Sequence, residues 1–138
     1  MEFSVKEYEA YNEQEILPLY ESVGWTNYTQ KPQMLKEAYL HSLKSYSAYV
    51  DNKLVGIIRV VGDGASVVFV QDLLVYPQYH RQGIGTELLK RIMEEYNSVY
   101  QLHLLTDNTE KTIAFYKSLG FLMDTDIECR AFSRYSVG

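Results

Sequence analysis

The first third of the chain carries apolar residues at helical spacing. Between residues 12 and 23 these positions share one helix face: Ile16, Leu17, Tyr20 and Val23. Gly24 is a typical helix stop, whereas Pro18 inside the run predicts a helix that begins late or bends. A second helical pattern follows Pro32, which suits a first helical turn. Its apolar positions are Met34, Leu35, Ala38, Tyr39 and Leu43. Two helices are therefore expected before residue 44.

The middle of the chain changes to short apolar runs that are typical of strands. These runs cover residues 47–50, 54–61 and 67–75, separated by turn-forming residues, and residues 3–6 alternate as an edge strand does. The run 67–75 is apolar on both faces except for the polar pair Gln71-Asp72, as expected of a buried central strand. The pattern predicts antiparallel strands that lead into this central strand.

Helical and strand patterns alternate in the second half. A helical run is expected at 88–96, directly after the Gly83 turn, then a strand at 100–105, a helix at 109–119, and one or two terminal strands from Gly120 onward. A strand–helix–strand unit implies a right-handed parallel crossover. The predicted fold class is α/β (α+β), with one domain over residues 1–138. Its mixed sheet is antiparallel first and parallel around the helix, with helices on both faces.

Composition narrows the class of protein. The 138 residues fit one domain with a real core. A net charge of −5 without a basic cluster argues against nucleic-acid binding. No apolar run approaches the ~18 residues of a membrane span, and the N-terminus lacks the layout of a secretion signal. We therefore expect a cytoplasmic protein that binds neither nucleic acid nor membrane and needs no metal.

The single cysteine agrees with a reducing compartment. Cys129 has no internal partner for a disulfide. It is either an acyl-accepting nucleophile or a small packed or idle thiol, and no motif around it favours the nucleophile.

The segment from Pro77 to Thr86 is the most informative one. It follows the central apolar run and leads directly into a helical run, and such a turn makes an anion site from free helical N–H groups. Gly83 and Gly85 lack a Cβ, so a phosphate can approach their amides. A dinucleotide fingerprint would need a third glycine at Leu88, and a P-loop would need a lysine after Gly85. Both of these readings fit poorly.

The longer pattern carries a resemblance. Leu73-x-Val75-x-Pro77, then Tyr79-His80-Arg81-Gln82-Gly83-Ile84-Gly85 and Leu88-Leu89, closely resembles the acetyl-CoA-binding segment of the GNAT superfamily of N-acetyltransferases. A second segment is similar to the family signature "Asn…Ala-x-x-Tyr-x-x-x-Gly-Phe": Asn108, then Ala114-Phe115-Tyr116-Lys117-Ser118-Leu119-Gly120-Phe121. The resemblance covers roughly residues 46 to 122. It implies a GNAT-like mixed sheet and acetyl-CoA as co-substrate.

The resemblance also implies which residues bind the cofactor. In the family the central strand splays from its parallel neighbour, and its free backbone groups bond the pantetheine arm and thioester. Here those groups belong to Leu73, Leu74 and Val75. The loop contacts would come from His80, Arg81, Gln82, Gly83, Ile84, Gly85 and Thr86. His80 departs from the usual Gln or Arg, which puts a side-chain contact there in doubt. Asn108 would meet the cofactor, or cap the helix before Thr109.

Two residues are candidates for proton transfer. By resemblance Tyr116 is the general acid and also lies at the cofactor, and a phenol with a pKa of ~10 stays protonated at neutral pH. The alternative for Tyr116 is a core aromatic beside Phe115. Asp72, in an apolar strand, is the candidate base or amine anchor. Its rival role is a structural carboxylate bonded to Arg59 or to backbone. Weaker base candidates are His103 and His41.

The acceptor site is expected in the N-terminal third. Trp25 and Tyr28 lie between the first two helices and, with Asp72, would bind the substrate; the alternative is simple packing of the helical hairpin. The run 56–63 with Val23-Gly24-Trp25 loosely resembles a branch that includes plant arylalkylamine acetyltransferases.

The sequence thus predicts an N-acetyltransferase that forms a direct ternary complex with a small-molecule primary amine, and the loose resemblance above gives an aryl-alkylamine as one candidate. The alternatives are a protein Lys or N-terminal acetyltransferase and a non-catalytic acetyl-CoA-binding regulatory module. A homodimer through residues 128–135 is a further hypothesis.

Overall fold

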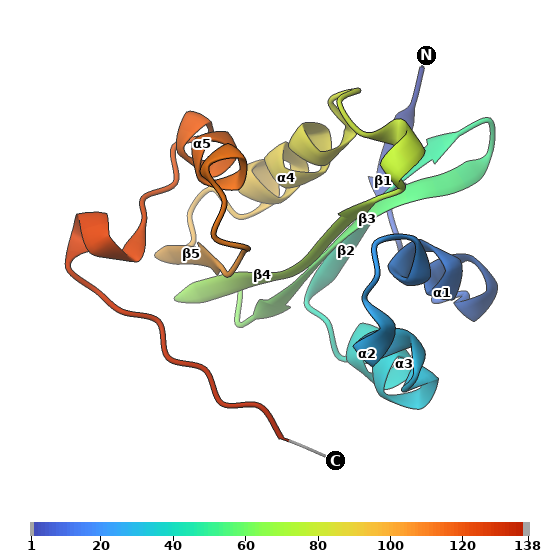
Figure 1. Ribbon diagram of the computed structural model, residues 1–138, viewed down its shortest axis with the longest axis horizontal. Coiled ribbons are helices and arrows are strands. Elements are labelled where there is room, and N and C mark those ends of the chain that lie inside the picture. The colour runs from blue at the N-terminus through green and yellow to red at the C-terminus, as the bar shows by residue number, and fades with distance from the viewer. Residues whose placement is uncertain (1, 137–138) are drawn as a thin grey trace. The chain divides into compact units, whose positions relative to one another are not determined.

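Five strands form one mixed sheet in the order β1-β2-β3-β4-β5 (Figure 1). The strands are β1 (Ser4–Glu7), β2 (Lys44–Val50), β3 (Lys53–Gly62), β4 (Val67–Val75) and β5 (Gln101–Leu104). The pairs from β1 to β4 are antiparallel, and β4 pairs in parallel with β5. This arrangement confirms the predicted mixed sheet, in which the parallel pair brackets the helix that follows β4.

The computed structural model describes residues 2–136 and divides them into two units, one ending at Leu105 and one beginning at Thr106. The first unit holds the sheet and four helices: α1 (Glu13–Ser22), α2 (Thr26–Thr29), α3 (Pro32–Leu40) and α4 (Ile84–Glu95). A short 3-10 turn, η1 (Pro77–Tyr79), precedes α4. The second unit holds α5 (Glu110–Ser118) and the 3-10 turn η2 (Asp124–Ile127). The single-domain expectation stays a prediction.

Helices cover both faces of the sheet within the first unit, as predicted (Figure 1). Helix α4 packs against β2, β3 and β4, while α1 packs against β3 and β4 from the other side. The core under α1 and α3 consists of Ile16, Leu19, Tyr20, Leu35, Leu54, Ile57 and Leu74. Burial of these side chains holds the N-terminal helices against the strand that carries Asp72.

Local capping explains where α1 begins. The helix starts at Glu13 and includes Pro18, so it does not begin late. The Asn12 side chain accepts a hydrogen bond from the Gln14 N–H at 3.0 Å, which satisfies one free donor of the first turn. Pro32 is the first residue of α3, as predicted. No described helix has the length and apolar character that a membrane span requires.

The predicted terminal strands are wrong for the described residues. From Gly120 to residue 136 the chain forms the turn η2 and no strand. The turn bonds within itself instead of pairing with a sheet. The Asp126 carboxylate accepts from the Met123 N–H at 2.9 Å, and the Cys129 N–H donates to the Asp124 carbonyl at 2.7 Å. Glu128, which caps the end of η2, adopts a left-handed φ of 56°.

Candidate functional site

The edge of β4 opens halfway along the strand. β4 runs to Val75, but β5 pairs with it only over Val67–Val70. Within the described residues, the part of β4 from Gln71 to Val75 therefore has no β5 partner on this edge. Backbone donors and acceptors on an unpaired edge are available to an extended ligand. Leu73, Leu74 and Val75 lie in this open part.

A tight loop joins the open edge to α4. Arg81 and Gly83 adopt left-handed φ values of 65° and 83°, and Gly83 is the N-cap without a side-chain capping bond. The first helical bond runs from the Glu87 N–H to the Gly83 carbonyl at 3.0 Å. The N–H groups of the helix's first three residues, 84–86, thus have no acceptor within the helix. Together with the helix dipole they make a place for an anion.

Glycine at position 83 leaves this end of the helix open. A Cβ built there would find no atom within 4 Å, so the cost of a larger residue is the left-handed backbone alone. At Gly85 the nearest neighbour of such a Cβ would be a Val75 methyl at 4.0 Å. The loop and the end of β4 therefore lie next to each other.

The His80 side chain turns back to the strand. Its Nε2 donates to the Val75 carbonyl at 2.8 Å, which closes the loop onto the last residue of β4. His80, which stands where the family usually has Gln or Arg, therefore has a hydrogen-bond partner within this chain. A cofactor contact from His80 stays a prediction.

Asp72 lies in the interior between the sheet and α1. It is 1% exposed, and its Oδ2 accepts from Arg59 Nε and from the Tyr20 hydroxyl, both at 2.7 Å. Arg59 is its cross-strand neighbour on β3 and also donates to the Ser42 hydroxyl at 3.2 Å. This geometry is the structural alternative stated for Asp72. Its role as base or amine anchor stays a prediction.

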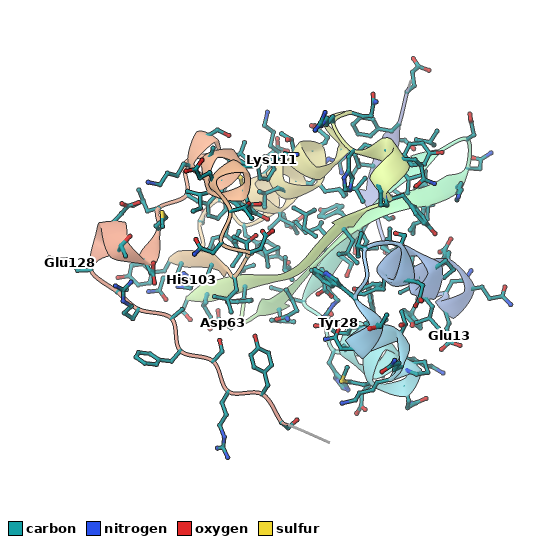
Figure 2. All side chains as sticks on the ribbon, in the orientation of Figure 1. Glu13, Tyr28, Asp63, His103, Lys111 and Glu128 are labelled. Atoms are coloured by element: carbon teal, nitrogen blue, oxygen red, sulfur yellow. The ribbon has the colours of Figure 1, made fainter. Side chains whose placement is uncertain are left out.

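Trp25 and Tyr28 form an aromatic pair beside the sheet. Their rings stack with centroids 6.0 Å apart at 28°, and Tyr20 meets the Tyr28 ring edge-on at 5.4 Å. Figure 2 labels Tyr28 at α2, and the Gln71 amide on β4 donates to its hydroxyl at 3.5 Å. The pair is half-buried, whereas Gln71 is exposed. The structure thus brings the predicted acceptor residues to the point where β4 opens.

The sequence analysis gave no site role to two side chains. Gln71 was predicted only as part of a polar pair in the central strand, and Tyr20 only as an apolar position on a helix face. A polar glutamine inside an otherwise apolar run was the available signal for the first. Nothing in the sequence linked Tyr20 to a carboxylate 52 positions away.

Tyr116 and Asn108 belong to the second unit. Tyr116 is half-buried on α5, with its ring 5.0 Å from Phe115 and 5.8 Å from Phe121. Burial raises the pKa of this phenol above 10.0, and a hydrogen bond with the Thr106 side chain acts in the opposite direction. The capping alternative for Asn108 is wrong, because Thr109 is the N-cap and its hydroxyl accepts from the Thr112 N–H at 3.2 Å.

The remaining candidates lie on the surface. His103 is exposed and lies on β5, where Figure 2 labels it, and His41 is the exposed C-cap of α3. Cys129 is exposed after η2, which rules out the packed form of the thiol.

Comparison with known proteins identifies the family. The family model described as "Acetyltransferase (GNAT) domain" matches residues 42–122, which include β3, β4, the loop, α4, β5 and α5. The chain belongs to the GNAT acetyltransferase family. The resemblance in the loop and in the Tyr116 segment is thereby confirmed at the level of the family.

Similar proteins agree with this assignment. The structure of a GNAT family acetyltransferase from Streptococcus pneumoniae TIGR4, SP0256, is 41% identical, with a TM-score of 0.89 and 98% of both chains covered. An uncharacterized N-acetyltransferase, ycf52, from Gracilaria tenuistipitata var. liui is 31% identical over 114 residues, which is 78% of this chain and 60% of that protein. A soybean (Glycine max) protein named histone acetyltransferase TAP1 is 28% identical over 119 residues, covering 78% of this chain and 51% of its own. The chain thus spans about half to three fifths of the length of these two curated relatives.

Proposed function

We propose that this chain is an acetyl-CoA-dependent N-acetyltransferase that acetylates the primary amine of a small molecule. The observation that carries the proposal is the open edge of β4 beside the uncapped start of α4. Acetyl-CoA has an extended pantetheine arm and a pyrophosphate, so it needs both features together. Its thioester supplies the activated acetyl group.

The loop and the strand edge fit the two parts of acetyl-CoA. The N–H groups of Ile84, Gly85 and Thr86 would hold the pyrophosphate, because they lack intrahelical acceptors. The open edge at Leu73–Val75 would bond the pantetheine amides as a neighbouring strand does. A strand N–H near the thioester oxygen would stabilise the charge that develops there during attack. Asn108 is an additional proposed contact.

Tyr116 is the proposed general acid. Because burial raises its pKa, its hydroxyl stays protonated at neutral pH and is able to donate to a departing thiolate. The hydroxyl's hydrogen bond with the Thr106 side chain would orient it. The tyrosine needs only one proton per turnover, which solvent returns.

The acceptor would bind at Trp25 and Tyr28. The stacked rings offer an aromatic surface for an amine, and Gln71 adds a polar group at the edge of β4. This combination suits a compact amine with an apolar or aromatic body, such as an aryl-alkylamine. A primary amine is mostly protonated at pH 7, so it must lose a proton before attack.

Acetylation of a protein amine is the second candidate. The observation in its favour is the similarity to the soybean protein named as a histone acetyltransferase. Cytoplasmic localisation and a homodimer stay predictions.

The direct test is acceptor-dependent release of CoA from acetyl-CoA. The panel should contain aryl-alkylamines, polyamines, aminoglycosides, amino acids and lysine peptides. We expect turnover with a small amine that falls strongly in Tyr116→Phe. Turnover with peptides alone would favour the second candidate. Tight acetyl-CoA binding without turnover of any acceptor would contradict the proposed enzymatic activity and indicate a regulatory module.

A further inference from the structure

The strand β4 contains a bulge where its edge opens. Arg59 pairs with Asp72, but the next β3 residue, Val60, pairs with Val70, so Gln71 is an extra residue on β4. A bulge bends the strand and raises its local twist. The last pair between β4 and β5 is Val70 with Leu104, immediately before the bulge. The bend therefore coincides with the separation of β4 from β5.

A buried ion pair flanks this bulge. The Arg59 and Asp72 side chains are 5% and 0% exposed and meet at 2.7 Å. The pair is tied to two helices, because Tyr20 of α1 donates to Asp72 and its hydroxyl lies 2.9 Å from that of Tyr39 on α3. The other carboxylate oxygen, Oδ1, is buried without a hydrogen-bond partner in the described residues.

Stability alone is a poor reason for such a pair. Desolvation of two charges cancels much of their attraction, and a matched apolar pair is often as stable. Removing one partner is costly because the other charge stays buried. What a charged pair adds is discrimination, since a wrong neighbour leaves both charges unpaired.

The residues next to the pair do not by themselves distinguish the correct β3–β4 register from shifted ones. Beside the bulge, β3 carries Val60 and Val61, and β4 carries Val68, Phe69 and Val70, all of them apolar. A pairing shifted by one residue would place Val61 opposite Val68 or Val70 instead of Phe69, so apolar character alone does not select the register. Only one register places Arg59 opposite Asp72.

We propose that the Arg59–Asp72 pair is a register lock that fixes the bulge at Gln71 and thereby positions the open edge of β4. In this role Asp72 is a positioning residue and does not accept the amine proton. Its Oδ2 already accepts two hydrogen bonds, and the side chain has no exposed surface from which to reach an acceptor. The functional consequence rests on the proposed use of this edge by acetyl-CoA.

The decisive variant replaces both charges by apolar residues of similar volume, Arg59→Met with Asp72→Leu. We expect it to fold with a melting temperature near that of the wild type. Its amides from Gln71 to Val75 should exchange faster with deuterium and show shifted or multiple NMR signals. Acetyl-CoA should bind more weakly, and kcat/KM should fall on the order of 100-fold, as a misplacement of about 1 Å can cause.

The single variant Asp72→Asn separates positioning from base catalysis. A lost base would abolish the acidic limb of the kcat–pH profile and leave acetyl-CoA affinity unchanged, and that result would overturn the proposal. A lock predicts weaker acetyl-CoA binding with the shape of the pH profile retained. Tyr20→Phe is the matched control, because it removes one bond to Asp72 and keeps the ion pair.

The double variant tests the lock against a purely structural role. Wild-type exchange rates, affinity and activity in a stable double variant would overturn the proposal. If that variant does not fold, Arg59→Lys replaces it, since lysine keeps the charge but lacks the planar Nε donor. Faster exchange confined to residues 70–75 supports the lock, and unchanged exchange contradicts it. These exchange rates need no ligand, so they are informative even if wild-type protein fails to bind acetyl-CoA.

Discussion

The two sides of the open β4 edge differ in what they present to a ligand. Toward α4 the groups are backbone N–H and carbonyl groups, set by Gly83 and by the end of the β4–β5 pairing. Toward α2 they are side chains, namely Trp25, Tyr28 and Gln71. Backbone groups suit a ligand part that every relative shares. Side chains vary without disturbing the fold, so they suit the part of the reaction in which relatives differ.

The comparison predicts that variants on the α4 side change acetyl-CoA binding and that variants on the α2 side change the amine. The effects should be separable by measuring acetyl-CoA affinity and amine KM on the same protein. A single side-chain variant that impaired both acetyl-CoA affinity and amine KM would contradict this separation of the two sides.

The largest expected loss of activity comes from a variant on neither side of the edge, at the proposed general acid. Tyr116→Phe should lower kcat by about 10²- to 10⁴-fold, the usual range for a general acid, with acetyl-CoA affinity unchanged. Stopped assays at saturating substrates measure kcat, and calorimetry measures affinity. Because Tyr116 packs against Phe115 and Phe121, the melting temperature should be compared in parallel. An unchanged kcat would remove this role from Tyr116.

Gly83→Ala should weaken acetyl-CoA binding by about 10-fold, because a left-handed alanine costs roughly 1–2 kcal/mol and relaxes the helix N-terminus. Gly24→Ala is a matched control. Gly24 has φ 78° and, like Gly83, no atom within 4 Å of a built Cβ. Both variants should lose similar stability in denaturant titrations. Equal loss of acetyl-CoA affinity in the two would show that position 83 has no special part in binding.

His80→Ala should weaken acetyl-CoA binding by roughly 5-fold, since the lost bond to the Val75 carbonyl is worth about 1 kcal/mol. The amine KM should stay constant. Isothermal titration of acetyl-CoA measures the change, and His103→Ala on the exposed face of β5 is the control. Were the amine KM to rise instead, the loop would reach the acceptor side.

The smallest effect is expected from the aromatic pair. Trp25→Leu should raise the amine KM about 2- to 5-fold, because a ring near a cation contributes roughly 0.5–1 kcal/mol at a partly exposed site. Acetyl-CoA affinity should not change. Tyr28→Phe keeps the ring and removes the hydroxyl that accepts from Gln71. A larger effect in Tyr28→Phe than in Trp25→Leu would assign recognition to the hydroxyl.

The parts of the site differ in how well the sequence predicted them. The loop and α4 were predictable because glycine spacing and apolar periodicity act locally, within residues 77–95. Of the two partners of Asp72, Arg59 was predicted as the structural alternative, whereas Tyr20 was not, because it lies 52 positions away. The bulge at Gln71 left no signal either, because the residues beside it on both strands are apolar and match in more than one register.

Local hydrogen bonds explain why two predictions, the Asn108 cap and the terminal strands, were wrong. Asn108 and Thr109 are both good capping residues, and only the hydroxyl's bond to Thr112 distinguishes them. After Gly120 the apolar residues suggested strands, but the Asp126 carboxylate and the Cys129 N–H close a turn. Phe132, 93% exposed, shows that apolar character alone does not form a strand without a partner edge.

The central claim is that acetyl-CoA binds along the open edge of β4 and at the start of α4. Titration of ¹⁵N-labelled protein with acetyl-CoA, followed by amide exchange, tests it directly. We predict large shifts and slower exchange at residues 73–75 and 83–86, with α1 and β1 unchanged. Saturable binding that leaves those amides unperturbed, or no binding at all, would contradict the account.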